Sequence, residues 1–190
     1  MRVAAWVDGN PIDVAEVEDR LARLRANDRA GSLPVADSRE GRQLRRWVAQ
    51  VLVVERLCTH FIAGSCSEPL RPPIADRTNE SRLPAVLSRA DAAALGSIVA
   101  AAWTGNPAVQ RAATMVTTDV SIPDERLQRE AELTATDDGG AAWSSDQLLT
   151  SARLEAFARW LARATHERVR LEEGYEHPGD AAQPDNLHEH

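Results

Sequence analysis

The sequence predicts a mainly α-helical domain of five to six helices, in which a small sheet of two or three strands joins the two ends of the chain. Three observations support this fold class. Apolar residues recur at helical spacing through most of the chain, capping residues precede several of these stretches, and strand-like patterns occur near the two ends. The 190 residues suit a single domain, which we place at 1–173, followed by a tail at 174–190.

The first predicted elements are a strand hairpin and a helix. Residues 3–12 contain the strand-like "VAAWV", and the Asp8-Gly9 pair that follows is a strong signal for a tight turn. A helix then begins at Asp13, with Glu16 three residues later, as in a capping box. The inward stripe of this helix is predicted to be Val14, Val17, Leu21 and Leu24.

The second predicted helix is long and should run through the middle of the fold. Asp37-Ser38 supply its cap, and Gly64 is expected to end it as a C-cap glycine. Two cysteines without an export signal predict free thiols, and Cys58 is expected in the core. The broad apolar face of this helix consists of Leu44, Trp47, Val48, Val51, Leu52, Val54, Leu57, Cys58, Phe61 and Ile62.

Three helices are predicted in the next part of the chain. One covers 89–103, and a second starts at Asn106-Pro107, where an N-cap residue precedes a proline at the first helical position. A third, over 124–133, follows Ser121 and Pro123.

The last helix and the last strand close the fold. Ser144 and Gln147 form a second capping-box pattern at the start of the helix. Residues 167–172, "ERVRLE", alternate charged and apolar side chains and are predicted to pair with the N-terminal strand. The inward stripe of the helix is Leu154, Phe157, Trp160, Leu161 and Ala164.

The composition narrows the classes of function. The net charge is −7, and all 22 basic residues are arginines, so a nucleic-acid partner is not expected. Lysine-free, alanine-rich composition is typical of GC-rich coding sequences, as in actinobacteria. No apolar run is long enough for a membrane span, and no secretory leader is recognisable, which predicts a cytoplasmic protein without a membrane partner.

Two stretches resemble a known family. "VDGNPI" after a short strand, followed by an amphipathic helix and the long "LRRWVAQVLVVERL" helix, resembles the N-terminal domain of SurA and PpiC-type chaperones, and "VTTDVSIPDERLQREAEL" is similar to a later segment of that family. The resemblance implies a helical, chaperone-like fold. Only residues 134–147 stand where the family has a parvulin domain, too few for a domain of its own, so prolyl isomerase activity is not implied.

From these features we expect a non-isomerase binding module that holds an apolar peptide, partner or small molecule in a groove between helices. The sequence leaves open whether the protein forms a homodimer. Neither glycine-rich phosphate loops nor common hydrolase and metalloprotease motifs occur in the sequence. Tryptophan is the residue type expected to line such a groove, because its large ring suits apolar contacts. The candidates are Trp47, Trp103, Trp143 and Trp160, the first, second and fourth of which also fit the core.

The histidine-containing tail supports an alternative. His177, His188 and His190 could bind a divalent transition metal or act as general acid and base, since imidazole suits both roles. The tail could instead dock without chemistry or be disordered. Its "HPGD" and "PDN" turns resemble actinobacterial chains associated with polyketide pathways, and no reaction follows from this resemblance by itself. The alternative function is a small tailoring enzyme, for instance of an aromatic polyketide, in which the helical groove holds the substrate and the tail histidines complete the site.

Overall fold

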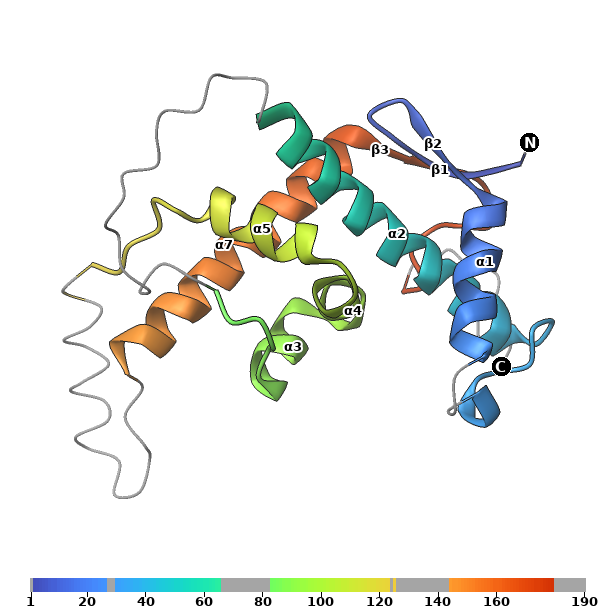
Figure 1. Ribbon diagram of the computed structural model, residues 1–190, viewed down its shortest axis with the longest axis horizontal. Helices are drawn as coiled ribbons and strands as arrows, with labels where there is room; N and C mark the ends of the chain where they lie inside the picture. The colour runs from blue at the N-terminus through green and yellow to red at the C-terminus, as the bar shows by residue number, and fades with distance from the viewer. Residues whose placement is uncertain (1, 27–29, 66–82, 124, 126–143, 180–190) are drawn as a thin grey trace, which may run out of the picture.

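The protein is mainly helical, with a small sheet at one end (Figure 1). The computed structural model describes residues 2–26, 30–65, 83–123, 125 and 144–179. These residues form six α-helices and one three-stranded antiparallel sheet, which confirms the predicted fold class. The strands are β1 (Val3–Val7), β2 (Asn10–Asp13) and β3 (Val169–Leu171), and the helices are α1 (Val14–Arg25), α2 (Arg39–Ser65), α3 (Arg89–Leu95), α4 (Ser97–Gly105), α5 (Pro107–Val116) and α7 (Ser145–Arg168). The helix predicted over 124–133 falls outside the described residues, apart from 125.

The sheet joins the two ends of the described chain, as the sequence predicts. Its strand order is β2-β1-β3, with β1 antiparallel to both neighbours. Asp8 and Gly9 link β1 to β2 with φ angles of 52° and 76°, and such a pair of positive angles is what a tight Asp-Gly hairpin requires. On the other side of β1, Val7 pairs with Val169 of β3.

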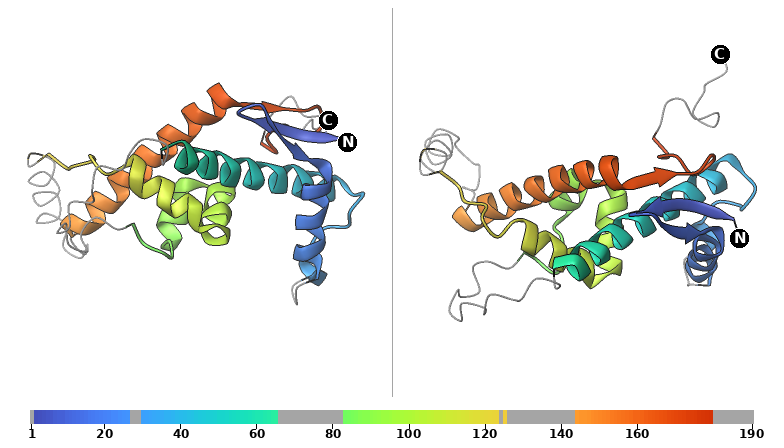
Figure 2. Two further views of the ribbon diagram at one scale, coloured as in Figure 1. Left: turned by 45° about the horizontal axis from the view of Figure 1, so that its top comes forward. Right: turned by 90° about the horizontal axis from the view of Figure 1, so that it is seen from above.

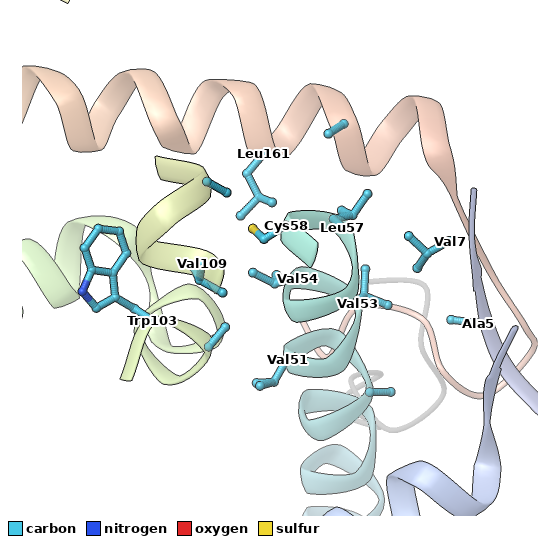
Figure 3. Packing of buried hydrophobic residues seen from close by; sticks show 14 of the residues in the cluster. Ala5, Val7, Val51, Val53, Val54, Leu57, Cys58, Trp103, Val109 and Leu161 are labelled. Atoms are coloured by element: carbon cyan, nitrogen blue, oxygen red, sulfur yellow. The ribbon is translucent and has the colours of Figure 1, made fainter. Parts of the chain in front are cut away.

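Helix α2 is the centre of the fold. It contacts α1, α4, α5, α7 and β1, and Figure 2 shows the other helices and the sheet arranged around it. Its predicted apolar face is buried or half-buried, and Ala49 and Val53 are buried as well, so the apolar surface is wider than one stripe. In Figure 3, Val54 and Cys58 of α2 lie close to Leu161 of α7 and Val109 of α5. Burial of α2 on several sides explains its apolar character.

Side-chain caps start the helices at the predicted positions. The backbone N–H of Asp13 donates to Glu16 Oε1 at 3.1 Å at the start of α1. Asn106 Oδ1 accepts from the N–H of Ala108 at 2.9 Å ahead of α5. Ahead of α7, Ser144 Oγ accepts from the N–H of Gln147 at 3.2 Å. Each of these bonds satisfies a donor at the start of a helix, and together they confirm the predicted starts of α1, α5 and α7.

Two helix boundaries differ from the prediction, and both involve glycine. The single helix predicted over 89–103 is divided into α3 and α4 at Gly96, whose φ of 81° and ψ of 158° are not helical. Glycine reaches this conformation without a steric cost. Because the apolar residues on both sides of Gly96 keep a helical spacing, the sequence pattern did not reveal the break. Conversely, Gly64 lies inside α2, which extends to Ser65, so Gly64 is not the C-cap residue that we expected.

Candidate functional site: a cleft between α1, α2 and α4

Three helices each contribute one short face to an open cleft. In every case the lining residues are separated by one, three or four positions, the spacing that places side chains on the same side of a helix. In the left view of Figure 2, α1 and α4 both lie below α2. The cleft is lined by Arg20, Arg23 and Leu24 of α1 and by Ala26 directly after it, by Trp47, Val48 and Val51 of α2, and by Ala101, Thr104 and Gly105 of α4.

The cleft has a volume of about 770 Å³, which lies within the range of ~300–1,000 Å³ that is usual for small-molecule sites. Its surface is predominantly apolar. The indole of Trp47 is the largest apolar group in the lining, and Val48 and Val51 continue the floor along α2. Trp47 Nε1 donates to Ser97 Oγ at 3.1 Å, so the ring is tied to the first residue of α4. This bond fixes the indole across the α2–α4 boundary of the cleft.

One ion pair joins α1 to α2 beside the cleft. Arg20 of α1 binds Glu55 of α2 through Nη2 and Oε1, and both side chains are largely shielded from solvent. Gly105 lies next to this pair: a Cβ added there would stand 3.4 Å from both charged atoms, at the tight end of ordinary contact. Gly105 therefore lies beside the ion pair, and a methyl group added there would make ordinary contacts with both charged atoms.

The predicted tryptophans do not share this cleft. Trp47 lines it, whereas Trp103 is completely buried in the core, with Nε1 donating to the carbonyl of Pro84 at 3.2 Å. Trp160 packs against Phe61 and Phe157, with ring centroids 5.0 and 5.8 Å away. Trp143 lies outside the described residues.

Sequence reasoning did not identify the arginines of the cleft. Arg20 and Arg23 fit the polar face of an amphipathic helix, and periodicity within α1 cannot show that α4 lies opposite that face. The spacing of Arg20, Arg23 and Leu24 shows only that they share one side of the helix. Their place in a cleft depends on the position of α4, which begins directly after Gly96.

The start of the tail is docked against α2. Tyr175 is buried, with 8% of its surface exposed, and its carbonyl accepts a hydrogen bond from Gln50 Nε2 at 3.0 Å. Burial raises the pKa of the Tyr175 hydroxyl above its ordinary value of 10.0. The carbonyl of Gly174 accepts from Arg46 Nε at 3.3 Å. These contacts hold residues 174–175 against α2.

Of the three predicted metal ligands, the structure describes only His177, because His188 and His190 lie outside the described residues. His177 Nδ1 accepts from the N–H of Gly179 at 3.0 Å, which leaves Nε2 as its remaining ring nitrogen. Within the part of the chain that the structure describes, no three histidine, cysteine or acidic side chains are close enough to hold a metal ion.

A second polar cluster lies at the hairpin turn. Asp8 accepts hydrogen bonds from Arg168, and its Oδ2 is 2.9 Å from His60 Nδ1. The hydrogen bond from Arg168 is the main reason why the pKa of Asp8 is lowered from its ordinary value of 3.8. The same bond raises the pKa of Arg168. This cluster links the turn after β1 to α2 and to the end of α7.

Cys58 is fully buried, as predicted for a core residue. Removal from water disfavours the charged thiolate and raises the pKa of Cys58 to about 12. A thiol in this environment is a poor nucleophile, because the thiolate is the reactive form.

None of the described helices combines the length and the apolarity required to cross a membrane. No curated protein matches the chain, and neither does any solved structure. Residues 3–40 match a family described as "family of unknown function (DUF7158)". The matched segment includes β1, β2 and α1 and ends at the first turn of α2, so it carries the α1 wall of the cleft but neither its floor nor its α4 wall.

Proposed function

We propose that the protein is a binding module that holds a small apolar molecule in the cleft between α1, α2 and α4. The cleft carries this proposal: it has the volume of a small-molecule site, an apolar floor and a tryptophan fixed by a hydrogen bond. Binding would remove apolar surface of the ligand and of Trp47 from water, at about 25 cal/mol for each Å² buried.

The resemblance of the N-terminal pattern to SurA-type chaperone domains is in keeping with a binding role. Within that role we favour a small molecule over a long peptide, because the cleft is bounded by three helices and has a limited volume. Prolyl isomerase activity is no part of the proposal.

The proposal can be tested with N-phenyl-1-naphthylamine, a neutral aromatic probe whose fluorescence rises in apolar surroundings. Ala101 lines the cleft from α4, so the ring of an Ala101→Phe variant should occupy volume that the probe needs. We expect this variant to weaken probe binding by about tenfold, equivalent to about 1.4 kcal/mol.

A matched control is Ala93→Phe. Ala93 is exposed on α3 and is not among the residues that line the cleft, so the same change adds the same apolar ring elsewhere. Circular dichroism should show that both variants keep the helical fold. Equal probe affinity in the two variants, or no binding by the parent protein, would contradict the proposed site.

A further inference from the structure

The charge of the cleft is opposite in sign to the charge of the protein. The chain as a whole carries −7, yet the described lining of the cleft contains two arginines and no acidic residue. Positive charge beside an apolar floor attracts a negative group on an apolar ligand.

The two arginines have different roles. Arg20 is bound to Glu55, which neutralises its charge and holds it against α2. Arg23, one turn further along α1, is exposed, and no hydrogen bond or ion pair joins it to another described residue. Its guanidinium is therefore available for a ligand at the rim of the cleft. Guanidinium groups bind carboxylate, sulfate and phosphate oxygens through paired N–H donors.

Apolar and charged surfaces are arranged in sequence across the cleft. Leu24 follows Arg23 on the same side of α1, and Trp47, Val48 and Val51 form the floor. A ligand whose apolar body covers this floor would place one end close to α1, where Arg23 lies.

We infer that the natural occupant of the cleft is a small amphiphilic anion, with an apolar body on the α2 floor and one anionic oxygen group bound by Arg23. This inference rests on the proposed function and adds the chemical class of the ligand. It identifies Arg23 as the residue that selects anionic over neutral ligands.

Two probes with the same ring system isolate the contribution of the charge. 8-Anilinonaphthalene-1-sulfonate carries a sulfonate that N-phenyl-1-naphthylamine lacks, and both can be titrated by fluorescence. In an Arg23→Gln variant we expect the affinity for the sulfonate probe to fall about fivefold, as for a charge-assisted hydrogen bond at a solvent-accessible site, and the affinity for the neutral probe to change by a clearly smaller factor. Added salt should weaken binding of the sulfonate probe to the parent protein more than to the variant.

Arg25→Gln is the matched control. Arg25 lies two residues along the same helix end, carries the same charge and is not part of the cleft lining. Loss of sulfonate affinity in Arg23→Gln alone supports the inference. An equal response of the two variants overturns the inference but leaves the proposed function standing, provided that Ala101→Phe still weakens binding of the neutral probe. If Ala101→Phe affects neither probe, the proposed function fails, and the inference fails with it.

Discussion

Arg168, the last residue of α7, holds Asp8 of the β1–β2 turn through two hydrogen bonds, from Nε to Oδ1 at 2.6 Å and from Nη2 to Oδ2 at 2.7 Å. The two residues are 160 positions apart in the sequence. The N–H of Asp8 also donates to the carbonyl of Arg168 at 2.9 Å. This contact therefore joins the first turn of the chain to the end of its last described helix.

The Asp8–Arg168 contact predicts a specific dependence of stability on pH. The folded-state pKa of Asp8 is lowered. The contribution of its charged carboxylate to the free energy of unfolding is therefore fully present above the ordinary pKa of 3.8, and it is lost as the pH falls from there through the folded-state pKa. Asp8→Asn should reduce the free energy of unfolding near neutral pH by about 0.5–1 kcal/mol, the usual effect of a solvent-accessible ion pair. The difference from the parent protein should narrow below pH 3.8 in urea denaturation.

Asparagine is the appropriate replacement, because it tolerates the positive φ of 52° at this position and so removes the charge without straining the turn. Asp119→Asn serves as control, since Asp119 is exposed. A stability difference between Asp8→Asn and the parent that stays constant through acidic pH would contradict the prediction.

The burial of Cys58 predicts slow thiol chemistry. In a Cys66→Ala background, where Cys58 is the remaining thiol, we expect negligible reaction with 5,5′-dithiobis(2-nitrobenzoate) in the native state near pH 8. The cause is the enclosed position of the thiol together with its pKa of about 12. Full reaction should follow addition of denaturant. Rapid stoichiometric labelling of the native protein would show that the α2–α7 contact opens readily.

The sequence predicted the elements of this fold better than the site. Capping pairs such as Ser144 and Gln147 act within one turn, so their sequence spacing is sufficient to locate a helix start. The cleft instead depends on where α4 lies relative to α1, which no local pattern records. The predicted tryptophan groove illustrates the difference: a large apolar ring suits either a core or a groove, and only the fold places Trp103 in the former and Trp47 in the latter.

The two glycines at which prediction and structure differ should respond in opposite ways to alanine. Gly64 is helical and has open space around its missing Cβ, so Gly64→Ala should raise the free energy of unfolding by about 0.5 kcal/mol. Gly96 has a φ of 81°, so Gly96→Ala should lower it by about 1 kcal/mol or more. Chemical denaturation of the two variants measures both effects. Stabilisation by Gly96→Ala would instead support the uninterrupted helix that the sequence suggested.

The docked part of the tail predicts a sharp boundary in a truncation series. Ending the chain after Gly179 retains the buried Tyr175 and the two carbonyls that Gln50 and Arg46 contact, so we expect the free energy of unfolding to change by less than about 0.5 kcal/mol. Ending it after Glu173 removes the Tyr175 ring from the core and removes the acceptors of two donors on α2. This second truncation should cost about 2–4 kcal/mol, the sum expected from exposure of one large side chain and loss of buried hydrogen bonds.

Two substitutions divide that loss between its causes. Tyr175→Phe keeps the ring and the backbone carbonyl and should be nearly neutral, whereas Tyr175→Ala loses only the ring contacts. The truncation after Glu173 should be more destabilising than Tyr175→Ala, because it alone also leaves Gln50 Nε2 and the Nε of Arg46 without these carbonyls. Urea denaturation provides the comparison. If both truncations were as stable as the full chain, residues 174–175 would contribute nothing to the fold, and their contacts with α2 would be incidental.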